Sequence, residues 1–423
     1  PFYTRSMVYT MPEFLERRYN PQSRTILSVI SLVSYVLTKV AVTVYAGGLV
    51  FQQVFGIKEL WGIDFFWIAA IGLVVLTALY TIFGGMKSVL YTSVLQTPIL
   101  LLGSLIILVL GFKELGGWDE MMRVCGAVTV NDYGDTMTNL IRSNDDANFP
   151  WLGALIGSAI IGFWYWCTDQ FIVQRVLSGK NEMEARRGTI FGAYLKLLPV
   201  FLFLIPGMIA FALHQKYIGA GGEGFLPMLE NGTANADAAF PTLVAKLLPA
   251  GVKGLVVCGI LAALMSSLAS LFNSSAMLFT IDFYKRFRPQ TSEKKLVGIG
   301  QVATVVIVIL GILWIPIMRS VGDVLYTYLQ DVQSVLAPGI AAAFLLGICW
   351  KRTSAQGGMW GLISGMVIGL TRLGAKVYYS NAGEVADSTF KYLFYDMNWL
   401  FFCGWMFLFC IIVVIVVSLA TEA

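Results

Sequence analysis

A run of aromatic and polar residues interrupts an apolar stretch of the chain near residue 165. It reads Trp164, Tyr165, Trp166, Cys167, Thr168, Asp169 and Gln170. Aromatic faces beside hydroxyl and amide groups suit a polyhydroxylated ring, because the C–H face of the ring stacks on the aromatic while its hydroxyls find hydrogen-bond partners. An interfacial aromatic belt is the alternative, but Trp166 lies well inside the stretch. Gly157 and Gly162 precede the run and predict a weakened or broken helix, of the kind that lines transporter cavities.

Charged and amide side chains inside other apolar stretches are functional candidates, because they are costly there. Lys196 lies within the stretch 188–213, too deep for easy snorkelling. Its ammonium could donate to solute hydroxyls, or it could form a structural ion pair. Gln330 and Asp331 lie in a later apolar stretch. Lys39 is better explained as the partner of a neighbouring carboxylate.

Small hydroxyl residues line one helical face in the stretch 252–281. Ala263, Ser266 and Ser267 follow an i, i+3, i+4 spacing, and Ser270 comes one turn later. Two hydroxyls and a backbone carbonyl are neutral oxygen ligands, which suit a hard cation of low charge such as Na⁺ rather than Zn²⁺. Close helix packing through small residues is the alternative that spacing alone leaves open.

The composition indicates a polytopic membrane protein. Of 423 residues, 57% are hydrophobic and 13% charged, about half the charged fraction of soluble globular chains. The mean hydropathy is +0.74. A single histidine, His214, disfavours histidine-based catalysis or a multi-histidine metal site, and a net charge of +4 gives no case for nucleic acid.

Ten apolar stretches are long enough to cross a hydrocarbon core of about 30 Å. They lie at 25–55, 61–84, 88–111, 151–177, 188–213, 252–281, 296–318, 322–350, 356–375 and 395–419. The alternation expected of transmembrane strands is absent, so we expect helices. If residues 1–24 are cytoplasmic, the internal segments hold more Lys and Arg than the longer external loops, about 112–149 and 214–250.

At these residues the chain resembles the sodium/solute symporters, and among them the sodium–sugar cotransporters. The resemblance is carried by six groups of residues: 164–170 continuing through Ile172, Val173, Gln174 and Arg175; Tyr194-Leu195-Lys196-Leu197; Leu264-Met265-Ser266-Ser267-Leu268-Ala269-Ser270 with Phe272-Asn273-Ser274; Leu278-Phe279-Thr280; Tyr9-Thr10-Met11-Pro12-Glu13-Phe14; and Thr81-Ile82-Phe83-Gly84-Gly85. It covers essentially the whole chain.

The resemblance implies an all-α, leucine-transporter-like fold with two inverted five-helix repeats and binding sites near the midplane. On this mapping residues 1–111 are the end of the first repeat, 112–150 an external loop, 151–350 the second repeat and 351–423 peripheral helices. The first two helices of the first repeat are then missing from this chain. We expect them to complete the sodium site and to supply further solute contacts.

Residue roles also follow from the resemblance. It implies that sodium is held by the Ala263 carbonyl and the hydroxyls of Ser266 and Ser267, and that the sugar is contacted by Trp166, Lys196 and Gln330, with Tyr165 as inner gate and Tyr326 near the outer gate. The chain departs from the family at Gly162, where some members place a side chain toward the sugar, and at Ser93, where many carry an aspartate. Neutral Ser93 and Ala269 favour one Na⁺ per sugar, although Ser270 could add a hydroxyl.

The sequence therefore predicts a secondary active transporter, not an enzyme. We expect Na⁺ to move inward with a neutral hexose, glucose or galactose, across the cell membrane by alternating access, without a cofactor and as a monomer or weak oligomer. One alternative keeps the fold but changes the solute to an inositol, another polyol or a sialic acid. A second is a membrane-embedded sugar sensor or channel.

Overall fold

The computed structural model describes residues 2–6, 8–229, 232–321, 324–381 and 386–421. Their contacts divide the chain into two units. Unit 1 holds residues 1–42, 143–189 and 271–423, and unit 2 holds residues 43–142 and 190–270. Three of the four divisions fall inside helices, namely α4 (Ala41–Phe55), α9 (Glu182–Leu195) and α12 (Ala250–Met277).

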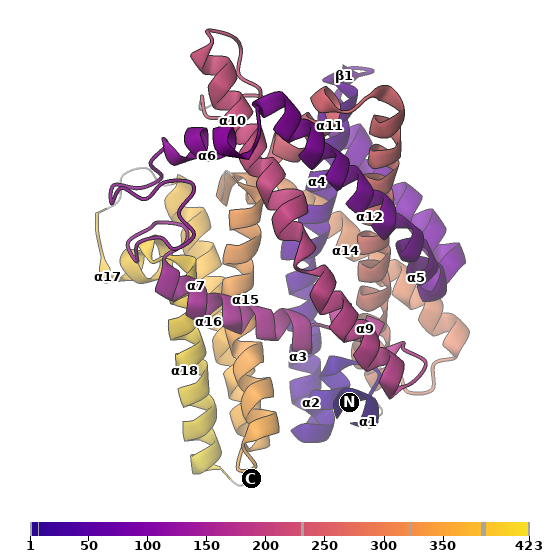
Figure 1. Ribbon diagram of the computed structural model, residues 1–423. Coiled ribbons are helices and arrows are strands. Elements are labelled where there is room, and N and C mark those ends of the chain that lie inside the picture. The colour runs from indigo at the N-terminus through magenta and orange to yellow at the C-terminus, as the bar shows by residue number, and fades with distance from the viewer. Residues whose placement is uncertain (1, 7, 230–231, 322–323, 382–385, 422–423) are drawn as a thin grey trace. The chain divides into compact units, whose positions relative to one another are not determined.

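Unit 1 is helical throughout the part that the structure describes. Its elements are α1 (Phe2–Ser6), α2 (Met11–Arg18), α3 (Pro21–Ser34), η1 (Tyr35–Val40), α7 (Trp151–Phe163), η2 (Trp164–Thr168), α8 (Gln170–Leu177), η5 (Leu278–Tyr284), α13 (Lys285–Phe287), α14 (Glu293–Val321), α15 (Leu325–Cys349), α16 (Ala355–Asn381), α17 (Thr389–Lys391), η6 (Tyr392–Asp396) and α18 (Trp399–Ala420). The segments η1, η2, η5 and η6 are π-helical. Figure 1 shows α15, α16 and α18 side by side, and these three helices also contact one another closely.

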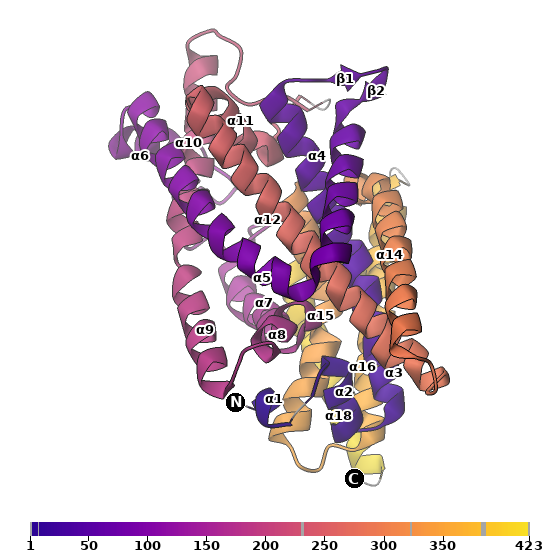
Figure 2. The ribbon, with the colours of Figure 1, turned by 90° about the vertical axis from the view of Figure 1, so that its right-hand side faces the viewer.

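Unit 2 adds one small hairpin to its helices. Its elements are most of α4, β1 (Glu59–Leu60), β2 (Ile63–Asp64), α5 (Phe65–Leu115), α6 (Trp118–Gly126), the second part of α9, η3 (Val200–Leu204), α10 (Ile205–Gly219), η4 (Ala236–Ala238), α11 (Ala239–Leu247) and most of α12. The strands β1 and β2 pair antiparallel. Figure 2 shows that the two halves of α5 run in different directions.

Local sequence explains where several helices begin. The side chains of Asn20, Asp64 and Asn398 accept hydrogen bonds from backbone N–H groups in the first turns of α3, α5 and α18. Each of these bonds satisfies a donor that the helix itself leaves unpaired. α5 ends at Gly116, whose φ of +111° is a conformation that glycine adopts without steric cost.

Each unit has a hydrophobic core of its own. In unit 1 the core joins residues of α2, α3, α7, α15 and α18, such as Leu15, Phe344 and Trp399. In unit 2 it joins α5, α6, α10, α11 and α12 around residues such as Ile209 and Val256. Many large apolar side chains elsewhere are exposed, as expected of helices that face lipid.

Eight helices of the described residues are long and apolar enough to cross a membrane, where the sequence predicts ten. The stretches predicted at 61–84 and 88–111 form one helical element, α5, in which Gln96–Leu115 qualifies. The stretch predicted at 356–375 forms α16, whose glycines and Arg372 lower its hydropathy. The all-helical membrane architecture is confirmed, and two of the ten predicted spans fall short of this measure.

Candidate functional site

The helix that carries the aromatic run is interrupted, as the sequence predicts. α7 passes into the π-helical η2 at Trp164, and at Asp169 the backbone turns to an extended conformation with φ −76° and ψ 122°. The Asp169 carboxylate accepts the Phe171 N–H at 3.1 Å and so begins α8. π-helical turns often mark functional positions.

The two glycines before the run do not form the break. A Cβ at Gly157 would lie 2.8 Å from the Leu400 carbonyl oxygen, so the glycine permits close packing of α7 against α18. A Cβ at Gly162 would meet no heavy atom within 4 Å. Both glycines lie within the regular helix α7, and the interruption begins at Trp164, directly after it. Gly157 is thus a packing position, and the expectation that the two glycines weaken the helix stays a prediction.

Each predicted solute-site residue of unit 1 contacts another one close to it in the sequence. Tyr165 and Trp166 pack edge to face with ring centroids 5.2 Å apart. The Gln330 amide donates to the Tyr326 hydroxyl at 3.1 Å, one turn away on α15. Trp166 is 49% exposed.

Lys196 belongs to unit 2, at the turn that follows α9. Its backbone N–H lies 3.1 Å from the Gly192 carbonyl oxygen and 3.2 Å from that of Ala193, so the regular helix ends here. The Lys196 side chain is exposed. Its position at a helix interruption agrees with a cavity-lining role, and its joint role with Trp166 and Gln330 stays a prediction.

The predicted sodium ligands lie on one face of α12 in unit 2. Ala263, Ser266 and Ser267 belong to an uninterrupted α-helix, so the Ala263 carbonyl has its second lone pair to offer. The Ser266 hydroxyl is buried and lies 2.7 Å from the Ser93 hydroxyl of α5. We call these four residues the serine cluster.

The serine cluster is chemically neutral. Its four contributing groups are three hydroxyls and one carbonyl, which match the ligand preference of a hard monovalent cation. Among the residues that the structure describes, no group of three or more His, Cys, Asp and Glu side chains could hold a metal ion. The assignment of the serine cluster to Na⁺ stays a prediction.

Lys39 forms the ion pair that the sequence predicts, and its partner is Asp169. Both side chains are buried, and the Tyr35 hydroxyl donates to the same carboxylate at 3.1 Å. The Lys39 ammonium also lies 4.4 Å from the ring centroid of Phe171 and 5.6 Å from that of Tyr165. The ion pair therefore touches the residue that we expect to act as the inner gate.

Two features of this region escape sequence reasoning. Asp169 is one of the polar residues of the aromatic run, but its role as the cap of α8 is not among the sequence predictions. The signal for that role is an Asp directly before an apolar helical segment. Asp331 pairs with Lys376 at 2.5 Å and Arg372 at 3.6 Å, both on α16. Nothing in the local sequence indicates these partners, which lie more than 40 residues away.

The chain is similar in sequence and in fold to known proteins. Residues 1–365 match the model of the sodium:solute symporter family. The chain is 38% identical over 385 residues to a sodium/myo-inositol cotransporter 2 of Homo sapiens, covering 88% of this chain and 56% of that protein. It is 37% identical over 450 residues to a sodium/glucose cotransporter 1 of Ovis aries, covering 100% of this chain and 65% of that protein.

A third relative is a sodium/mannose cotransporter of Bos taurus, 37% identical over 440 residues, with 100% of this chain and 72% of that protein covered. The chain thus spans less than two thirds of the length of the first two relatives. Among solved structures, a Na⁺-coupled sialic acid symporter in a substrate-bound outward-open state matches with a TM-score of 0.73 at 21% identity. That match covers 100% of this chain and 79% of the other, and it shows the fold.

Proposed function

The chain belongs to the sodium:solute symporter family, and from this premise we propose that it couples the inward movement of Na⁺ to that of a neutral polyhydroxylated solute, a hexose such as glucose or galactose. The relatives named above include cotransporters of glucose, mannose and myo-inositol. Each of these solutes is a neutral ring that carries several hydroxyls. No covalent chemistry is needed for such transport, so no catalytic residue is assigned.

The serine cluster is the observation that carries this proposal. The Ser93–Ser266 hydrogen bond at 2.7 Å fixes the orientation of one hydroxyl, and Ser267 and the Ala263 carbonyl lie on the same face of α12. Neutral oxygens carry no negative charge to offset that of the ion. We therefore expect the ion to be held weakly enough to be released inside the cell. A carboxylate in the same place would hold Na⁺ more tightly.

Solute binding would use groups of a different kind. Trp166, which is 49% exposed, would stack on the ring of the solute, and Lys196 and Gln330 would donate hydrogen bonds to its hydroxyls. Tyr165 would close the inner side and Tyr326, which bonds Gln330, would act near the outer side. Bound Na⁺ would favour the outward-open arrangement and so raise the population that is competent to bind solute.

A second candidate solute is myo-inositol. The human relative at 38% identity is a sodium/myo-inositol cotransporter, and myo-inositol is, like a hexose, a neutral ring that carries several hydroxyls. The likeness to the sialic acid symporter is a likeness of fold, so it gives no support to an anionic sugar.

The arrangement in the membrane is part of the proposal. We assign residues 1–111 to the end of the first inverted repeat, 112–150 to an external loop, 151–350 to the second repeat and 351–423 to peripheral helices. The basic segments, such as 178–187 and 285–295, would then be cytoplasmic and the protein would reside in the cell membrane, bound to lipid and either monomeric or weakly associated.

Uptake by the full-length protein in proteoliposomes tests the proposal. Labelled glucose, galactose and myo-inositol should accumulate above equilibrium with an inward Na⁺ gradient and not with an equal K⁺ gradient. Equilibration without accumulation would indicate a channel, and binding without uptake would indicate a sensor. Either result would contradict symport, and the ranking of the three solutes decides between hexose and inositol.

A further inference from the structure

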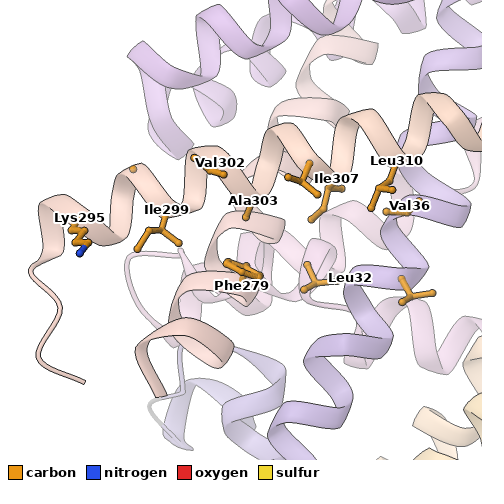
Figure 3. Close-up of a pocket in the computed structure, with 12 residues that line it drawn as sticks. Leu32, Val36, Phe279, Lys295, Ile299, Val302, Ala303, Ile307 and Leu310 are labelled. Carbon is orange, nitrogen blue, oxygen red and sulfur yellow. The ribbon is translucent and has the colours of Figure 1, made fainter. Parts of the chain in front are cut away.

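A partly open apolar pocket lies within unit 1, between α3, η1, η5 and α14. Its volume is about 600 Å³, within the range of roughly 300–1,000 Å³ that is common for small-ligand pockets. Apart from Lys295 and Gly298, apolar side chains line it, among them Leu32, Phe279 and Leu310 (Figure 3). None of the residues so far assigned to Na⁺ or solute belongs to it.

The pocket is long and runs along α14. Lys295 lies at one end and Leu310 toward the other, as Figure 3 shows. The 15 residue steps between them correspond to roughly 22 Å of helix at about 1.5 Å per residue. One leaflet of a bilayer with a hydrocarbon core of about 30 Å is roughly 15 Å thick. The pocket is therefore long enough to take an extended acyl chain of one leaflet.

Exposure along α14 agrees with a lipid environment. Val302 is 64% exposed and Val306 49% exposed, although both line the pocket. α14 is itself one of the helices apolar enough to span a membrane. Exposed apolar side chains on such a helix are in contact with hydrocarbon.

Basic residues near the Lys295 end of the pocket favour a lipid with a negatively charged headgroup. The segment 285–295 contains five basic residues and one acid: Lys285, Arg286, Arg288, Lys294 and Lys295 against Glu293. The Arg286 guanidinium is engaged by the Pro21 carbonyl and the Thr25 hydroxyl. For the Lys295 ammonium the structure records no hydrogen bond or ion pair within the described part of the chain. A basic residue at the membrane surface attracts anionic lipid.

We propose that this pocket binds an anionic phospholipid, with one acyl chain along α14 and the phosphate at Lys295. The apolar lining explains affinity for the acyl chain, and Lys295 explains a preference for a negatively charged headgroup. A zwitterionic lipid would keep the first interaction and lose much of the second.

Photocrosslinking of the full-length protein in nanodiscs tests this inference. The probes are phosphatidylglycerol and phosphatidylcholine, each with a diazirine in one acyl chain, and mass spectrometry locates the labelled peptide. We expect phosphatidylglycerol to label residues 298–310 more strongly than phosphatidylcholine. Lys295→Gln should lower the phosphatidylglycerol labelling by roughly fivefold. Lys294→Gln, the matched control, changes a neighbouring lysine that does not line the pocket.

A second variant tests the pocket itself. Gly298 lines the pocket, and a Cβ there would meet no heavy atom within 4 Å, so we expect the side chain of Gly298→Leu to occupy pocket space and abolish labelling of α14 by both lipids. Gly254→Leu, at an equally open position of α12 that does not line the pocket, should leave it unchanged.

A photoreactive residue at position 306 should crosslink to lipid. Crosslinks there to another segment or a second copy of the chain, or equal labelling by both lipids that Lys295→Gln does not change, would overturn the proposal.

Discussion

In unit 1 the charged side chains of the apolar helices neutralise one another, whereas in unit 2 the serine cluster gathers neutral oxygens. Lys39 pairs with Asp169, Asp331 with Lys376, and Arg24 with Asp282, whose carboxylate also accepts the Thr10 hydroxyl at 2.9 Å. In unit 2 the ion pair Arg123–Glu120 lies on α6, outside the spans.

This difference separates two uses of polar groups in a membrane. A buried charge that already has its counter-charge supports the fold, because breaking the pair leaves an uncompensated charge. A group of neutral oxygens carries no net charge, so a mobile cation can bind there and leave again. On this view the ion pairs of unit 1 determine stability, and the serine cluster of unit 2 determines Na⁺ dependence.

The largest effect should come from breaking the Lys39–Asp169 pair. Asp169→Asn keeps an oxygen to cap α8 but leaves the Lys39 ammonium buried without its counter-charge, so we expect a loss of about 3–5 kcal/mol in stability. The thermal midpoint of the full-length protein in detergent, followed by size-exclusion chromatography, should fall sharply.

Two further variants sharpen this test. Lys39→Met combined with Asp169→Asn removes both charges and should recover much of the lost midpoint. Asp387→Asn breaks an exposed pair with Lys391 and should leave the midpoint unchanged. A double variant as unstable as Asp169→Asn alone would show that the carboxylate acts by some means other than this ion pair.

The next largest effect should be on the affinity for the solute. Trp166→Ala removes a stacking face, and the solute concentration for half-maximal uptake should rise by an amount equivalent to about 1–3 kcal/mol at saturating Na⁺. Trp405→Ala, an exposed tryptophan of α18 with no assigned role, is the control. An unchanged half-saturation at normal expression would remove Trp166 from the solute site.

A smaller effect should follow from the hydrogen bond inside the serine cluster. Ser93→Ala removes the 2.7 Å bond to Ser266, and loss of one such bond is worth about 0.5–1.5 kcal/mol. The Na⁺ concentration for half-maximal uptake should therefore rise by up to about tenfold. Ser104→Ala changes a buried hydroxyl on the same helix that has no recorded partner among the described residues, and it should not alter Na⁺ dependence. Equal effects of the two variants would contradict a role for Ser93.

Local features of the molecule could be predicted from sequence. Apolar length and composition predict the membrane helices, and the polar residues and preceding glycines of the aromatic run predict an interrupted helix there. The cost of a buried ammonium predicts that Lys39 has a carboxylate partner. Each of these inferences depends on the free-energy cost of placing one segment or one side chain in the interior of a membrane.

Long-range pairing could not be predicted in the same way. The contact between Ser93 and Ser266 joins residues 173 positions apart, and that between Lys39 and Asp169 joins residues 130 apart. Such pairs depend on how helices pack, which one sequence does not encode in any local pattern. The fusion of two predicted spans into α5 has a related cause, because helical hydrogen bonding continues through a bend that hydropathy alone reads as a boundary.

Sodium titration of solute uptake by Ser267→Ala tests the central claim most directly. At saturating solute, the full-length variant in proteoliposomes should need a higher Na⁺ concentration for half-maximal uptake than the unmodified protein or Ser104→Ala. Its maximal uptake should recover when Na⁺ is raised, because the coupling between Na⁺ and solute is reciprocal. A Ser267→Ala variant with an unchanged Na⁺ dependence would contradict the assignment of the serine cluster to Na⁺.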